Sequence, residues 1–316
     1  MAYTEYIYES PWCIEHIFYW EGNYGAKGEK RSERSKATPE QIKKQNQKNK
    51  ENRIRRLIQL NFDEGDYWLT LKYPKGTRKP FEEVMADFKR FIAIMRKEYK
   101  RKDISCKYIY RVEIGRLGGI HIHVVMSRLG NDGYTKLSGA WTRARKASDL
   151  EDLLAEYTDG MTHIDYVHRF KDGKMSDGRE LAEYIAKAQP DTLDDGTRIP
   201  EEELKQISKY GCSRNLIRPV PIKRTYSHWT MRRILDQGAD GLNMTSNRHR
   251  TDGYIIDKES WVQGINPITG LSYLHYTEIP GRKRHESKQY RNGQRREGKA
   301  EGILRPAPGT DTQAAE

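Results

Sequence analysis

The chain has few cysteines and no long apolar run. Its three cysteines, Cys13, Cys106 and Cys212, are scattered and odd in number, so they form neither a disulfide framework nor a zinc-binding pattern. No apolar run reaches membrane-spanning length, and the first residues lack the charged-then-apolar layout of a signal peptide. These absences argue against a disulfide-rich secreted domain and a membrane protein. We expect a cytoplasmic protein with no membrane partner.

The basic residues are concentrated in two places. The net charge is +12. Residues 26–56 hold twelve Lys and Arg against four Asp and Glu, residues 281–300 hold eight against two, and the rest of the chain is close to neutral. Basic appendages on a neutral body are typical of proteins that bind a polyanion, because each neutralised phosphate releases counterions. A tail that only improves solubility is the alternative for residues 281–316.

A helix is predicted over residues 40–57, where apolar positions are few. This scarcity favours a helix that follows phosphates over one that fills a core. The residues expected to contact nucleic acid are Lys43, Lys44, Arg53, Arg55 and Arg56 in this helix, and Arg214 and Arg218 in a later basic loop.

The order of the predicted elements indicates an α+β fold. A strand is expected at 66–73, a helix from Pro80 to about Lys100, strands at 108–114 and 119–126, helical segments around 137–145 and 149–157, and a strand at 162–170. Strand, helix, strand, strand, helix, strand is the order of a split βαβ, ferredoxin-like or RRM-like domain, an antiparallel sheet with helices on one face. The other face is then free to carry a site.

The same reading divides the chain into four parts. They are an N-terminal extension with the basic helix at 1–59, the α+β domain at 60–225, a small β-rich accessory region at 226–280, and a basic disordered tail at 281–316.

A metal-binding pattern lies in the predicted hairpin. Side chains alternate across a strand, so His121 and His123 share one face. The loop 115–119 is a turn by composition, and symmetric pairing around it places Glu113 opposite His121. Two imidazoles and a carboxylate then converge with coordination positions left open. This mixed donor set suits Mn²⁺ well and Mg²⁺ acceptably.

Two alternatives apply to this histidine pair. Histidines on one strand face are also found as hydrogen-bonded rim residues without a metal. A cupin would place a Glu shortly after the second histidine, and residues 124–128 contain none, which excludes that pattern.

A helix predicted over 176–189 carries Tyr184 and Lys187, which stand three residues apart and are therefore neighbours on its surface. A helical tyrosine that only packs is the alternative. Glu180, one turn earlier, either caps this helix or activates a water. His163 and Asp165 share a face of the strand at 162–170, where they either line the site or are solvated.

These motifs together resemble a known superfamily. His121-Ile122-His123 resembles the His-hydrophobe-His motif of the HUH endonucleases, Leu69-Thr70-Leu71 their first strand motif, and Tyr184-Ile185-Ala186-Lys187 their Tyr-x-x-Lys helix. Within the superfamily, the chain is most similar to rolling-circle replication initiators of phages and plasmids. The run 208–216, followed by Pro219, is also similar to that group. The resemblance covers about residues 60–225.

The resemblance implies a metal-dependent DNA nicking enzyme. Glu113, His121 and His123 would hold the divalent ion, Tyr184 would attack the scissile phosphate and keep a 5′-phosphotyrosine link, and Lys187 would assist it. The expected partner is single-stranded DNA, in an origin hairpin. The chain has no phosphate-binding loop of the Gly-x-x-x-x-Gly-Lys-Ser/Thr type, so a host helicase and polymerase are expected partners too. Position 188 is Ala, so a second tyrosine directly after Lys187 is missing.

Two other function classes stay open. One is another HUH enzyme of a mobile element, a transposase or a relaxase; such transposases are generally shorter, and relaxases usually place the tyrosine before the histidines. The other is a DNA-binding protein that uses the same fold without cleavage. In that case, replacing Tyr184 by Phe would leave activity unchanged.

Overall fold

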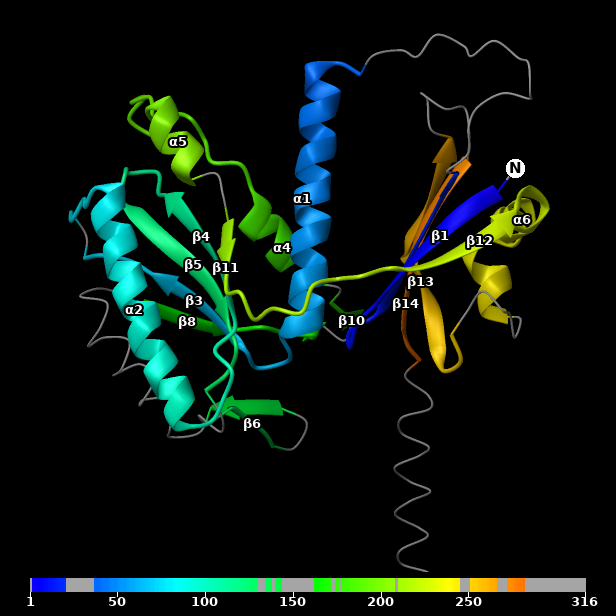
Figure 1. Ribbon diagram of the computed structural model, residues 1–316, viewed down its shortest axis with the longest axis horizontal. Coiled ribbons are helices and arrows are strands. Elements are labelled where there is room, and N and C mark those ends of the chain that lie inside the picture. The colour runs from blue at the N-terminus through cyan, green and yellow to red at the C-terminus, as the bar shows by residue number, and fades with distance from the viewer. Residues whose placement is uncertain are drawn as a thin grey trace, which may run out of the picture.

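The computed structural model describes residues 2–20, 37–74, 76–129, 134–137, 140–143, 162–171, 174–176, 178–207, 210–244, 251–265 and 272–281. Within these residues, the chain forms two five-stranded antiparallel sheets, two short two-stranded ribbons and five helices (Figure 1). The predicted α+β class with an antiparallel sheet is confirmed.

The first sheet contains the predicted hairpin. In chain order its first four strands lie side by side in the spatial order second, third, first, fourth, as in a ferredoxin-like domain, and β11 is added beside the second. All neighbouring strands are antiparallel. The strands are β3 (Tyr67–Leu71), β4 (Tyr108–Ile114), β5 (Ile120–Met126), β8 (Thr162–Tyr166) and β11 (Tyr210–Cys212).

Helices cover both faces of this sheet (Figure 1). Helix α2 (Phe81–Arg101) begins directly after Pro80, as predicted, and buries its apolar stripe on one face. Helices α1 (Pro39–Asn61) and α4 (Arg179–Ala186) pack on the opposite face, a layer that the sequence did not predict there. Because side chains alternate along β5, His121 and His123 lie on the α1 and α4 side.

The second sheet joins the N-terminal strands to strands from beyond residue 221. Its strand order is β12-β1-β2-β14-β13. Helix α6 (His228–Met244) covers one face and buries Met231, Ile234 and Leu242 there. The strands are β1 (Ala2–Glu9), β2 (Ile14–Trp20), β12 (Ile222–Ser227), β13 (Tyr254–Ile265) and β14 (Ser272–Pro280).

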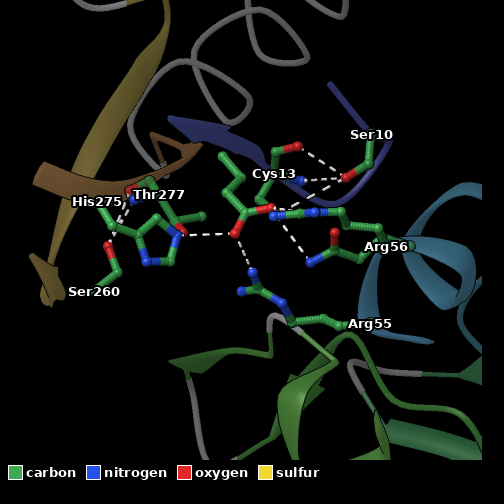
Figure 2. A network of polar contacts seen from close by, with 9 residues as sticks. Ser10, Cys13, Arg55, Arg56, Ser260, His275 and Thr277 are labelled. Atoms are coloured by element: carbon green, nitrogen blue, oxygen red, sulfur yellow. Dashed lines mark hydrogen bonds and ion pairs between the residues drawn. The ribbon is translucent and has the colours of Figure 1, made fainter. Parts of the chain in front are cut away.

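Helix α1 lies between the two sheets and binds them together (Figure 1). Arg55 and Arg56 donate to the carboxylate of Glu15 on β2, which also meets Nε2 of His275 on β14 at 2.8 Å (Figure 2). Arg55 is 2% exposed. Although burial opposes it, His275 and the two guanidinium groups hold the pKa of Glu15 well below its usual range. This charged cluster is therefore ionised and internally paired.

Helix α1 differs from the predicted phosphate-following helix in its second half. Thr38 and Gln41 form a capping box at its start. Beyond residue 53, however, Ile54, Leu57 and Ile58 are fully buried in the core that α1 shares with α4. Few apolar residues thus suffice for burial, because they fall on one side of the helix.

Some predicted elements are wrong or fall outside the described residues. The helix expected around 137–145 is wrong: β6 (Tyr134–Leu137) pairs with β7 (Ala140–Arg143), where aromatic and β-branched residues favour strands. The helix expected around 149–157 and the tail from 282 onward lie outside the described residues. The remaining elements are β9 (Phe170–Lys171), β10 (Lys174–Met175) and α5 (Glu201–Ile207).

Candidate active site

The hairpin of β4 and β5 has the predicted register, with Glu113 directly opposite His121. The Nε2 atoms of both imidazoles point at one carboxylate oxygen: His123 Nε2 lies 3.1 Å and His121 Nε2 lies 3.6 Å from Glu113 Oε2. The three side chains offer ligand atoms that all lie within 4.8 Å of one another. The hairpin can therefore hold one metal ion between them.

The surroundings of Glu113 test whether a cation fits. Its Oε2 is buried, yet it makes no well-directed hydrogen bond with the described residues. Hydrogen bonding to His121 and His123 holds the pKa of Glu113 well below its usual range, so the group is a carboxylate. Around an octahedral ion with ligands at about 2.1 Å, adjacent ligand atoms lie about 3 Å apart. The donor types, the spacing and the orphaned oxygen all fit a divalent cation.

Two residues of β3 hold His123 in place. Thr70 is paired with His123 in the strand register, and its Oγ1 lies 3.2 Å from His123 Nδ1. The ring of Trp68 stacks on the imidazole at 5.4 Å between centroids. Burial lowers the pKa of His123, which favours the neutral imidazole that binds metals. A hydrogen bond to the second ring nitrogen is the usual device that orients a metal-binding histidine.

Tyr184 reaches this group of ligands from α4. Its hydroxyl lies 3.1 Å from His123 Nε2, and its ring meets that imidazole edge to face at 4.8 Å between centroids. The side chain is 40% exposed, so a large substrate has access to the hydroxyl. A nucleophile-type oxygen and three metal-ligand side chains thus meet at one point of the surface.

The electrostatics of Tyr184 disfavour a free phenolate. Burial, and next the negative charge of Glu113, raise the pKa of Tyr184 above its ordinary value of about 10. The phenol is therefore protonated near neutral pH. A positive charge placed between Glu113 and the hydroxyl reverses this effect, because opposite charges favour the ionised form.

Lys187 lies beside the catalytic helix and not within it. Helix α4 ends at Ala186, earlier than predicted, and Lys187 is its exposed C-cap residue with φ −45° and ψ 136°. The start also differs from the predicted cap, since Gly178 occupies the N-cap in a left-handed conformation with φ 72°. Glu180 is exposed in the first turn.

The sequence analysis missed the residues that fix α4 against the sheet. Arg111 donates Nη1 to the backbone oxygen of Tyr184 at 2.7 Å. Gln47 and Lys50 of α1 donate to the backbone oxygen of Ala186 at 2.9 and 3.2 Å. Arg111 precedes Glu113 by two residues on one strand face, a signal that was available in the sequence. No comparable local pattern points to Lys50.

The residues predicted to contact nucleic acid fall into two groups. Lys43, Lys44, Arg53, Arg214 and Arg218 are exposed. Arg55 and Arg56 instead pair with Glu15, and the buried guanidinium of Arg55 has no face toward solvent. The prediction for Arg55 is therefore corrected, because the carboxylate that binds it lies forty residues away in sequence, on a strand that was not foreseen. His163 and Asp165 are exposed on β8, opposite Thr70 and Trp68.

Comparison with known proteins gives one match. Residues 66–189 match the model of a family described as replication-associated proteins of the ORF2 type. No curated protein and no solved structure matches the chain. None of the described helices combines the length and apolarity that a bilayer crossing needs. The matched segment contains the Glu113 hairpin and Tyr184, and the match supports a replication initiator type of protein.

Proposed function

We propose that the protein is a rolling-circle replication initiator of the HUH type, which nicks single-stranded DNA at an origin and rejoins it. The observation that carries this proposal is the 3.1 Å approach of the Tyr184 hydroxyl to a metal-ligand histidine. A packing tyrosine needs no such neighbours. The match of residues 66–189 to a replication-associated family points to the same class of protein.

In this proposal each residue has a chemical role. Tyr184 Oη forms the new bond to phosphorus, the bond from phosphorus to the 3′ oxygen breaks, and the phenol proton passes to water at the exposed edge of the ring. Glu113, His121 and His123 hold a divalent cation, Mn²⁺ or Mg²⁺, which when bound offsets the charge of the phosphate and of the developing phenolate. Lys187 is close enough in sequence to contact the same phosphate.

The phosphodiester energy is kept in the 5′-phosphotyrosine bond. Attack by a free 3′ hydroxyl can therefore rejoin the strand without ATP. Because a single tyrosine is available in this motif, a second protomer, a water or another side chain would complete termination. A host helicase would supply the single strand, and residues 60–225 form the nicking domain.

A pair of end-labelled DNAs tests the proposal. We expect that, with Mn²⁺, DNA labelled at its 3′ end gives a labelled protein band in a denaturing gel, whereas DNA labelled at its 5′ end gives a shortened free strand. A random-sequence single-stranded library supplies the unknown target. Tyr184→Phe should abolish the labelled band and preserve DNA binding. A labelled band that persists in Tyr184→Phe would refute the nucleophile assignment.

A further inference from the structure

The second sheet has one covered face and one open face. Directly paired residues share a face of an antiparallel sheet. Tyr3, Phe18 and Leu274 lie on the face that α6 covers. Tyr6 and Ile17, which pair with each other, lie on the opposite face, which α1 meets at Glu15. This opposite face, lined by Tyr6, Tyr8, Ile17, Tyr19, Lys223, Val262 and Tyr273, is the open face.

Tyrosine rings lie on the open face in positions that leave them accessible. Tyr19 stacks on Tyr6 at 4.9 Å between centroids and is 41% exposed. Tyr273 lies on β14, directly opposite Gly264 on β13. A side chain at position 264 would come within 2.8 Å of the Tyr273 hydroxyl, so the glycine lets this ring lie along the sheet. Tyr273 is 37% exposed, and its outer side is open to a ligand.

Cations accompany these rings. The ammonium of the exposed Lys223 lies 4.8 Å from the centroid of the Tyr6 ring. The guanidinium of Arg56 lies 3.7 Å from that of Tyr8. The acid on this part of the face, Glu15, is buried beneath Arg55 and Arg56.

A cavity extends the open face toward the first sheet. Its volume is about 180 Å³, and Tyr8, Arg56, Arg218 and Val220 are among the residues that line it. Val220 is 81% exposed. The cavity thus places the guanidinium of Arg218, in the chain segment that leaves β11, beside the end of the open face.

We propose that the open face binds single-stranded DNA. Bases would stack on Tyr19 and Tyr273, while Lys223 and Arg218 contact phosphates. Alternating aromatic and cationic groups on an exposed sheet are what unpaired bases and their backbone need, and a duplex hides its base faces from such a surface. The inference rests on the proposed function and gives the second sheet a role in it: holding the strand that Tyr184 cuts.

Binding experiments on the full chain test this inference. In a Tyr184→Phe background, which prevents cleavage, fluorescence anisotropy measures the affinity for an oligothymidine of about 30 nucleotides. Tyr19→Ala and Tyr273→Ala should each weaken binding about tenfold, the scale expected for one base stacked on an aromatic ring. Tyr19→Phe and Tyr273→Phe should retain it. Trp229→Ala is the matched control, an aromatic 74% exposed on α6 at the other face, and should leave binding unchanged.

Salt dependence separates stacking from charge. The two tyrosine-to-alanine variants should bind more weakly at every salt concentration with the same salt slope, whereas Lys223→Gln should reduce the slope. Unchanged affinity in both alanine variants overturns the inference, and it is the result expected if another protein or another segment of this chain covers the face. Adduct formation by the unsubstituted protein, measured in parallel, reports on the proposed function separately.

Discussion

Each of the two sheets brings carboxylates and imidazole rings together on neighbouring strands. In the first sheet, Glu113 faces His121 and His123, and its Oε2 has no well-directed hydrogen bond among the described residues. In the second, Glu15 receives Arg55, Arg56 and His275 at once (Figure 2). The residue types are similar, but the charge balance is different.

This difference separates a candidate metal site from a structural cluster. Guanidinium groups fixed on α1 already balance the charge of Glu15, and the cluster ties the helix to the sheet. The Glu113 carboxylate faces two imidazole rings at spacings that an ion fits. Within the described residues, only this group places three candidate ligand atoms within 4.8 Å of one another.

The largest effect is expected from breaking the structural cluster. Arg55→Met should lower the free energy of unfolding by about 3 kcal/mol, since it leaves Glu15 buried with one cationic partner fewer. Urea unfolding measures it. The control is Arg53→Met, an exposed arginine of the same helix, with an expected change below about 0.5 kcal/mol. Equal, small losses in both variants would mean that the cluster does not hold the two sheets together.

A smaller effect, with the opposite origin, is expected at the candidate metal site. Mn²⁺ at one hundred times its dissociation constant should raise the free energy of unfolding of the wild-type protein by about 2.7 kcal/mol. His121→Ala should remove this stabilisation and change metal-free stability little. His163→Ala, an exposed histidine on the neighbouring strand β8, should retain it. An equal Mn²⁺ response in all three proteins would place the ion elsewhere.

The residue behind His123 should tune the affinity for the ion. Thr70→Val keeps the shape of the side chain but removes the hydroxyl that lies 3.2 Å from His123 Nδ1. We expect Mn²⁺ affinity to fall about tenfold, the lower end of the range for such supporting hydrogen bonds. Titration calorimetry measures this change. Unaltered affinity would show that Trp68 stacking alone orients the imidazole.

The pH response should be the mildest and belongs to the second sheet. His16 lies 2.7 Å from Glu5 and 3.6 Å from Glu278, and its ring stacks on Tyr276. Although burial opposes it, the carboxylates of Glu278 and Glu5 raise the pKa of His16. Its stabilising contribution is therefore fully present below about pH 6.5 and is lost as pH rises through the raised pKa.

The variant His16→Gln checks this sign. Its free energy of unfolding, followed by urea titration at several pH values, should lack the decline that the wild-type protein shows on the alkaline side. If the decline survives the substitution, another group is responsible for it.

The candidate metal site could be predicted because its information is local. Alternation along β5 and the glycine-containing turn at 115–119 determine which residues face one another, so the Glu113–His121 pair follows from short-range geometry. The helical stripe of α2 from Val84 to Tyr99 is local in the same way. The approach of Tyr184 to His123 depends instead on the packing of α4 against the sheet, and the motif resemblance supplied that expectation.

The second sheet could not be predicted because its contacts are long-range. Strand β1 pairs with β12, more than two hundred residues later, and Glu15 meets Arg55 on a helix beyond another segment of chain. Strand patterns alone do not say which partners will pair. A basic residue with a distant buried acid has the same local sequence signature as one that binds phosphate, which is why Arg55 was misassigned.

The most direct test of the account is the site of covalent attachment. After reaction with single-stranded DNA and Mn²⁺, nuclease digestion and trypsin should leave a nucleotide mass on the peptide Glu180–Lys187, and fragmentation should place it on Tyr184. Attachment to another residue, or cleaved DNA with no attached nucleotide, would contradict the claim that Tyr184 attacks a phosphate held at Glu113, His121 and His123.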